Sequence, residues 1–412
     1  MLLTVAKLSL ISRKKTAILT FLSLTISMLV LFSVEHIRLE AKNSFNRSIS
    51  GTDLIVGAPS GQLNLLLYSV FRLGSPTNNI KYTSYELLAE NQLVDWAIPI
   101  SLGDSHKGFR VVGTNQSYFK HFRYGSDRSL TIETGKPFNG LFETVIGADV
   151  AEALGYKVDD KIIIAHGIGA TSFKNHDQAP FRIAGILTRT GTPVDKTVHV
   201  SLEAIEAIHL PVSQLLQLVD SPDAIALEPA TITAVLLGLN SRLATFRLQR
   251  VINNYPQDRL MAVLPGVAMT ELWSLVGTVE NILRFIAILV LISALFGLST
   301  MLLASMNERR SEIAVLRILG AGPKAIVMLI LLEALLLAIL SIISAITILT
   351  LALFSLNEFL AAEYGLFLTW NIFTLELLYV SLGVIAATSI TAALPCYEAY
   401  KSAILQQLSN TR

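Results

Sequence analysis

The sequence has few charged residues for its length and only one cysteine. Of its 412 residues, 15% are Asp, Glu, Lys or Arg and 52% are hydrophobic, and the mean hydropathy is +0.57. Soluble globular domains carry about 25% charged residues. The scarcity of charge therefore excludes an ordinary soluble protein and predicts a protein with a large membrane portion.

Several common nucleotide-binding and catalytic motifs are absent. The chain has no G-x-x-x-x-G-K-[ST] phosphate loop, no H-E-x-x-H zinc motif and no G-x-S-x-G nucleophile motif. We therefore expect no cofactor in this chain, and if ATP drives the protein, a partner chain binds the ATP and magnesium. The net charge of +1 gives no indication of nucleic-acid binding.

Four apolar runs are long enough to cross a bilayer, which takes about 20 residues. They are Thr16–Val34, Phe285–Met306, Ala325–Leu356 and Ile372–Leu394. The third would measure about 48 Å as a helix against a hydrocarbon core of about 30 Å, so it must tilt or extend beyond the membrane. The single cysteine, Cys396, lies at the inner end of the fourth run, so the segment between the first two runs cannot contain a disulfide.

The distribution of Lys and Arg predicts the orientation in the membrane. Basic residues flank the first run at Arg13, Lys14 and Lys15 and fill the loop Asn307–Lys324, whereas the loop Asn357–Asn371 has none. By the positive-inside rule, both termini and the Asn307–Lys324 loop are cytoplasmic. The first run lacks a small-residue cleavage site, so we interpret it as a retained anchor and not as a signal peptide.

The long segment between the first two runs alternates short strand and helix patterns. Predicted strands are Asp53–Val56, Arg110–Val112, Glu143–Ile146, Lys161–Ala165, Phe181–Leu187, Thr197–Val200 and Thr231–Leu237, and predicted helices are Asp149–Leu154, closed by Gly155, Leu202–His209 and one after Ser241. Helical stalks are expected over Glu35–Ser50 and Met269–Arg284. The fold class is thus an α-helical membrane protein with four transmembrane helices and a large α+β extracytoplasmic domain between the first and second. The predicted boundaries are 1–34 for the N-terminus and first helix, 35–284 for the domain with its stalks, and 285–412 for a domain with three membrane helices.

The Asn307–Lys324 loop has the pattern of an amphipathic helix. Its apolar stripe contains Ile313, Ala314, Leu316 and Leu319, its charged face contains Arg309, Arg310, Glu312 and Arg317, and Gly320 and Gly322 end it. Two interpretations remain open. The segment is either a solvated connector that holds the topology or a surface on which a cytoplasmic partner docks.

Other polar residues near the membrane have a structural and a functional interpretation. Glu333 lies about two turns into the third run, where a charge is costly unless it is paired, protonated or near the interface. A packing contact is favoured over a proton or substrate role. Glu280 and Arg284 fall at the outer boundary, where long side chains reach water.

All seven histidines lie in the segment between the first two runs. The best metal candidates are His166, His176 and Asp177, which share one loop. Their spacing matches no zinc template, so scattered surface histidines are the favoured interpretation.

The chain resembles the MacB/FtsX-like permeases, also called type VII or mechanotransmission ABC transporters. The segment ERRSEIAVLRILGA is similar to the E-R-x-x-E-I-x-x-x-R-x-x-G-A motif of the family at Glu308, Arg309, Glu312, Ile313, Arg317, Gly320 and Ala321. Two blocks of the outer segment, VIGADVAEALGYKVDDKIII and FRIAGILTRTGTPVDKTVHVSLEAI, are also similar to family blocks. Asp159 stands where the family usually has Gly.

The resemblance implies a permease subunit in the inner membrane of a bacterium, paired with a second copy and with two cytoplasmic ATPase subunits. Glu308, Arg309, Glu312, Ile313, Leu316, Arg317, Leu319 and Gly320 would then form the coupling helix that docks on the ATPase. ATP hydrolysis in the partner would move the outer domain and drive export or extrusion of a substrate.

Two alternatives are kept. In one, the same motion activates an extracytoplasmic partner protein and nothing is transported. In the other, the outer domain is a membrane-anchored metalloenzyme.

Overall fold

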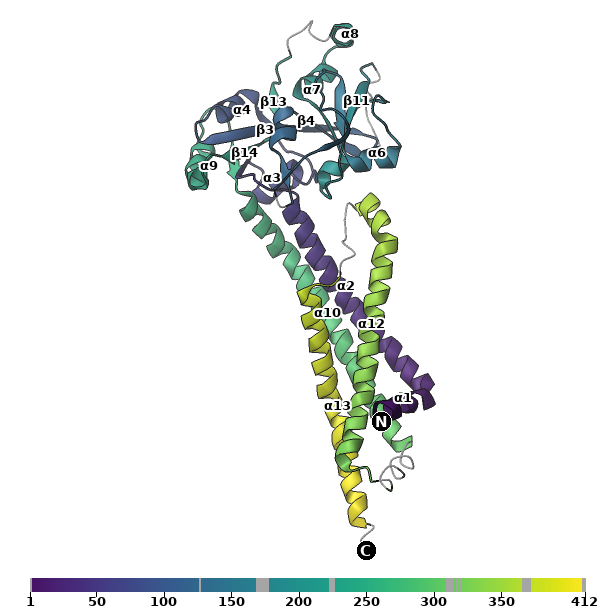
Figure 1. The fold of residues 1–412 in the computed structure, drawn as a ribbon. Helices are drawn as coiled ribbons and strands as arrows, with labels where there is room; N and C mark the ends of the chain where they lie inside the picture. Colours follow the sequence, from purple (N-terminus) through teal and green to yellow (C-terminus); the bar gives the residue numbers. More distant parts are fainter. Residues whose placement is uncertain are drawn as a thin grey trace. The chain divides into compact units, whose positions relative to one another are not determined.

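The structure is a computed structural model, which describes residues 2–125, 127–167, 178–221, 227–308, 315, 318, 320–364 and 372–409. The chain divides into two compact units (Figure 1). One consists mainly of Ala41–Val276 and is called the extramembrane domain here. The other contains Met1–Glu40, Gly277–Glu358 and the last long helix, and is called the membrane unit.

Four long helices form the membrane unit, preceded by the short helix α1 (Leu2–Ser12). They are α2 (Lys14–Arg47), α10 (Pro265–Glu308), α12 (Pro323–Tyr364) and α13 (Leu375–Ser409). The stretches long and apolar enough to cross a membrane are Lys14–Glu40, Pro265–Met306, Pro323–Leu356 and Leu375–Lys401. They confirm the four predicted membrane helices and the predicted fold class.

The fourth membrane helix starts later than its apolar run. We predicted a start at Ile372, whereas α13 starts at Leu375. The Thr374 hydroxyl accepts a hydrogen bond from the Leu377 backbone N–H at 3.2 Å, which caps the helix at this point. The cap residue, and not hydrophobicity, sets the boundary.

Hydrogen bonds connect neighbouring helices of the membrane unit. Ser341 of α12 donates to the Phe21 carbonyl of α2 at 3.3 Å, and Ser299 of α10 donates to the Thr391 carbonyl of α13 at 2.8 Å. The buried Cys396 thiol of α13 lies 3.6 Å from the Val327 carbonyl of α12. In lipid, where apolar burial does not favour association, such contacts and close packing hold helices together.

The described residues of the extramembrane domain are built on one mixed sheet (Figure 1). This sheet has eleven strands among those residues. The order is β15-β1-β14-β3-β4-β12-β8-β11-β7, with β10 paired to β3 and β9 to β11. The strands are β1 (Leu54–Gly57), β3 (Val94–His106), β4 (Phe109–Thr114), β7 (Ile132–Gly135), β8 (Glu143–Ile146), β9 (Lys161–Ile162), β10 (Ala165–His166), β11 (Phe181–Leu187), β12 (Thr197–Ser201), β14 (Ala234–Leu239) and β15 (Met261–Val263). The pairs β4–β12 and β8–β11 are parallel and the other pairs are antiparallel.

Short helices and two further ribbons complete the domain. The helices are α3 (Gln62–Ser69), α4 (Tyr82–Ala89), α5 (Gln116–His121), α6 (Ala148–Leu154), α7 (Leu202–His209), α8 (Val212–Asp220) and α9 (Thr245–Asn253), with the 3-10 turns η1 (Pro193–Lys196) and η2 (Arg242–Ala244). The ribbons pair β2 (Ile80–Lys81) with β13 (Thr231–Ile232), and β5 (Arg123–Tyr124) with β6 (Arg128–Ser129).

The sheet is apolar on both faces at β1 and β14, the second and third strands from one edge. Ile55 of β1 and Leu236 of β14 belong to one buried cluster, while their chain neighbours Leu54 and Leu237 belong to the cluster on the opposite face. Successive side chains of a strand point to opposite faces, so a strand buried on both sides needs a continuous apolar run. The sequences LIV and AVLL satisfy this requirement.

Several predicted elements are confirmed, two strand predictions need correction, and one strand was missed. The bounds of β8, β11 and α7 match the prediction, and Gly155 ends α6 in a left-handed conformation with φ 68°. The predicted strand Lys161–Ala165 is two strands with different partners, β9 and β10. The predicted strand Thr231–Leu237 breaks at Thr233, whose hydroxyl accepts a bond from the Leu102 N–H. The longest strand, β3, was not predicted.

Candidate functional site

The Asn307–Lys324 loop joins α10 to α12, and only part of it is described. Helix α10 ends at Glu308, of which the backbone alone is described. Six of the predicted docking residues lie outside the described residues: Arg309, Glu312, Ile313, Leu316, Arg317 and Leu319. Gly320 is left-handed, with φ 97°, and α12 begins three residues later at Pro323. Because a left-handed residue cannot continue a helix, Gly320 separates the loop from α12.

Two apolar side chains of this loop are exposed. Val315 is 55% exposed and Ile318 is 85% exposed. They lie three positions apart, which is the spacing of neighbours on one helical face. The apolar stripe predicted from the sequence contained Ile313, Ala314, Leu316 and Leu319 and did not include this pair.

Glu333 of α12 is buried and forms an ion pair with Arg13. The two side chains are 1% and 11% exposed, and Arg13 Nη2 lies 3.5 Å from Glu333 Oε2. Arg13 stands at the corner between α1 and α2, where the same nitrogen donates to the Ser9 hydroxyl at 2.8 Å. A carboxylate this far inside an apolar helix requires a partner. The sequence alone did not identify Arg13 as that partner.

A second ion pair joins α2 to α10. Glu35 of α2 has a 6% exposed side chain and lies 3.2 Å from Arg284 Nη2 of α10. Arg38, one turn further along α2, binds the same carboxylate at 2.6 Å. Glu35 therefore receives two guanidinium groups, one from its own helix and one from a neighbouring helix. Sequence reasoning placed Arg284 at the membrane boundary without this partner.

The candidate metal ligands are not brought together by any described contact. His166 lies in β10 with only its backbone described, and His176 and Asp177 lie outside the described residues. Within the described part of the chain, no group of three His, Cys, Asp or Glu residues could hold a metal ion. His106 contacts the Ile163 carbonyl at 2.7 Å and the Tyr156 hydroxyl at 3.0 Å, and its burial lowers its pKa.

His199 is a core residue and not a ligand. It is fully buried, and its Nδ1 lies 3.2 Å from the Val145 carbonyl. Burial, together with the charge of the buried Arg72, lowers the pKa of His199 to about 3 against the opposing effect of that carbonyl. The imidazole is therefore neutral at physiological pH.

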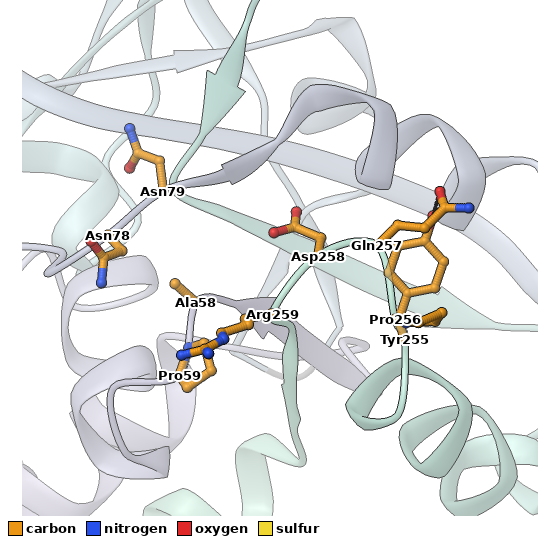
Figure 2. A pocket seen from close by; sticks show the side chains of 9 residues that line it. All are labelled: Ala58, Pro59, Asn78, Asn79, Tyr255, Pro256, Gln257, Asp258 and Arg259. Carbon is orange, nitrogen blue, oxygen red and sulfur yellow. Dashed lines mark hydrogen bonds between the residues drawn. The ribbon is translucent and has the colours of Figure 1, made fainter.

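The extramembrane domain has an open cavity of about 500 Å³ (Figure 2). Three loops line it: the residues after β1, the residues before β2, and the connection from α9 to β15. Its lining residues are Ala58, Pro59, Asn78, Asn79, Tyr255, Pro256, Gln257, Asp258 and Arg259. The volume is within the range of small-molecule sites.

Some of the polar groups in this cavity serve the fold. Asp258 Oδ2 accepts from the Lys81 N–H at 2.9 Å and from the Ser84 hydroxyl at 2.8 Å, so it fixes the start of α4. The Tyr255 hydroxyl donates to Gln257 at 2.9 Å. Arg259 and Asn78 line the opening (Figure 2). These hydrogen bonds hold in place the loops that line the cavity.

Comparison with known families matches two models to this chain. The MacB-like periplasmic core domain matches residues 17–234, more than half of the chain, and the FtsX-like permease C-terminal model matches residues 284–404. The sequences of curated proteins give no match. Among solved structures, the periplasmic region of MacB from Actinobacillus actinomycetemcomitans is similar at 10% identity, covering 55% of this chain and 94% of that chain with a TM-score of 0.34.

The two matched regions follow the architecture of the chain. The first covers α2 and most of the extramembrane domain, and the second covers the membrane helices α10, α12 and α13. The order of the two matched regions and the four membrane helices fit one family. Members of this family are generally non-catalytic membrane subunits. The chain belongs to the MacB/FtsX-like permeases of ABC transporters.

Proposed function

We propose that the chain is the transmembrane subunit of an ABC transporter in which a separate ATPase drives motion of the extramembrane domain. That motion exports or extrudes a substrate on the outer side of a bacterial inner membrane. The observation that carries this proposal is the loop between α10 and α12, with its exposed Val315 and Ile318 and its left-handed Gly320.

The loop has the properties that a docking element needs. An apolar helical face enters a groove on the partner, and flanking charges set the register. Val315 and Ile318 supply exposed apolar surface, and Arg309, Glu312 and Arg317 supply the charges. Only Gly320, Ala321 and Gly322 separate the end of the loop's apolar pattern from α12, so a displacement of the loop reaches α12 through a short connection.

The partners follow from the same proposal. The sequence has no phosphate-binding loop, so ATP and magnesium bind to the ATPase subunits, of which we expect two, paired with two copies of this chain. Both termini and the loop lie on the cytoplasmic side by the distribution of Lys and Arg. The extramembrane domain then meets substrates or partner proteins outside.

Substitutions in the loop test the docking role. Glu312→Lys, Leu316→Asp and Ile318→Asp should each abolish co-purification of the ATPase or the ATP hydrolysis that the permease stimulates. The matched control is Leu275→Asp, which places the same charge on an exposed leucine of α10 within the extramembrane domain. Normal stimulation in all three loop variants would contradict the docking role.

A reconstituted complex separates transport from signalling. In nanodiscs or liposomes with the ATPase present, an exporter moves or extracts a substrate, whereas a signal transmitter only activates a bound extracytoplasmic partner. Mass spectrometry of material that co-purifies with the chain supplies the compounds to test. Activation of a partner without any substrate movement would replace the export proposal by the signalling one.

A further inference from the structure

The docking loop and the extramembrane domain are attached to different pairs of helices. The loop follows α10 and precedes α12, whereas the domain follows α2 and precedes α10. Helix α10 therefore connects the loop to the domain directly. Helix α2 also enters the domain, but no stretch of chain joins it to the loop.

The Arg13–Glu333 pair supplies the missing connection between α2 and the loop. Glu333 lies ten positions after Pro323, the first residue of α12, which is about 15 Å along the helix. Arg13 immediately precedes α2. The 3.5 Å contact thus joins the beginning of α2 to the part of α12 that follows the loop.

We propose that Arg13 and Glu333 are positioning residues that make α2 follow α12 when the loop is displaced. The proposal rests on the proposed function and adds a second route of transmission to it. The domain is then moved by two helices, α10 through the chain itself and α2 through this ion pair.

The burial of the pair explains why it can transmit force. Glu333 and Arg13 are 1% and 11% exposed, so water does not replace either partner when the helices move. Separating two buried opposite charges removes their mutual attraction, which is far less favourable than sliding one apolar surface over another. The pair therefore resists separation, and α2 and α12 move together at this point.

The surroundings strengthen the contact. The Arg13 guanidinium is also held by Ser9 of α1 at 2.8 Å, so its position is fixed from a second side. Further along, Ser341 of α12 donates to the Phe21 carbonyl of α2 at 3.3 Å. Among the described residues, an ion pair and a neutral hydrogen bond thus both join the two helices.

The test measures helix movement in the complete protein bound to its ATPase in nanodiscs. Spin labels are placed on Ile37→Cys of α2 and Tyr379→Cys of α13, both exposed, in a Cys396→Ser background. Pulsed electron paramagnetic resonance gives the distance between the labels without nucleotide and with ATP bound. ATPase binding and ATP hydrolysis are measured on the same samples.

Single and paired substitutions distinguish positioning from stability. Arg13→Gln and Glu333→Gln should each reduce the nucleotide-dependent change in distance by at least half while the ATPase still binds. The exchanged pair Arg13→Glu with Glu333→Arg should restore it. The paired variant Arg13→Gln with Glu333→Gln removes both buried charges, so it should fold where a single variant does not. It should also lose the nucleotide-dependent change in distance. Lys15→Gln, an exposed neighbour, is the control and should match the unsubstituted protein.

Two results would overturn the proposal. The first is a full change in distance in both single Gln variants and the paired Gln variant, and the second is a loss that the exchanged pair does not restore. An unsubstituted protein that binds no ATPase or shows no change would instead overturn the proposed function, together with this addition to it.

Discussion

The Asp159 carboxylate lies 2.7 Å from Arg182 Nη1, while the Asp159 backbone is left-handed with φ 73°. The same guanidinium also binds Glu143. Gly is the one residue that adopts this backbone conformation without strain. Asp tolerates the conformation better than most residues and gains an ion pair there.

Asp159→Gly should leave the stability of the extramembrane domain unchanged or slightly raised. Relief of the left-handed backbone is worth about 1 kcal/mol, and the lost ion pair is exposed and contributes little. Asp159→Val should lower the free energy of unfolding by at least about 1 kcal/mol, because a β-branched residue is strained at this φ. Urea unfolding followed by tryptophan fluorescence measures both. Equal stability of the Gly and Val variants would contradict the role assigned to the backbone.

His199 should make the extramembrane domain less stable in acid. Its pKa is about 3 in the fold and about 6.5 when unfolded, so between these values only the unfolded chain takes up the proton. Stability is therefore fully present above pH 6.5 and falls by up to about 1.4 kcal/mol per pH unit as the pH is lowered toward 3.

The His199→Gln variant tests this dependence. Its unfolding free energy between pH 7 and pH 5 should change less steeply than that of the unsubstituted protein, because one titrating group has been removed. A His199→Gln protein with the original slope would show that other groups cause the acid sensitivity.

Gly147→Ala should destabilise the domain. A Cβ at this position would meet the Asp195 carbonyl at 2.3 Å and the Val194 carbonyl at 2.4 Å, both of them backbone atoms. Forcing these segments apart costs about 1–3 kcal/mol. Gly103→Ala is the control, since a Cβ there would meet nothing within 4 Å. Thermal unfolding of the two variants should differ by several degrees, and equal midpoints would count against the close packing at Gly147.

Arg284→Gln should weaken the contact between α2 and α10 more than Arg38→Gln does. Both side chains bind Glu35, but only Arg284 comes from another helix. Because Arg284 is 45% exposed, we expect a loss of only about 1 kcal/mol. A double-mutant cycle with Glu35→Gln, read out by thermal unfolding in detergent, isolates the pair. Additive effects of Glu35→Gln and Arg284→Gln would mean that the pair contributes nothing.

The sequence predicted the parts of the fold that local patterns determine. Apolar runs located the membrane helices, and strand patterns located β8 and β11. The prediction missed β3 because Pro99, Gly103 and Asp104 interrupt the residue pattern that is typical of a central strand. The structure accommodates Pro99 because the ladder with β4 begins only at Ser101, so the missing N–H faces no partner there.

The sequence predicted the parts of the candidate site that lie in one continuous segment of the chain, and it did not predict the parts that several segments form together. The docking loop is a continuous stretch and its motif is readable, although the exposure of Ile318 is not. The partner of Glu333 was out of reach, since Arg13 lies at the opposite end of the sequence and only tertiary packing brings the two together. The cavity lined by Asn78 and Arg259 likewise depends on three separate loops.

Helix α10 runs without interruption from Pro265 to Glu308, 44 residues or about 66 Å. A rod of this length acts as a lever. If one end turns by about 5°, the other end is displaced by about 6 Å, more than one helical turn. A small rotation at the loop end of α10 would thereby become a displacement at its other end that is comparable to the diameter of a side chain.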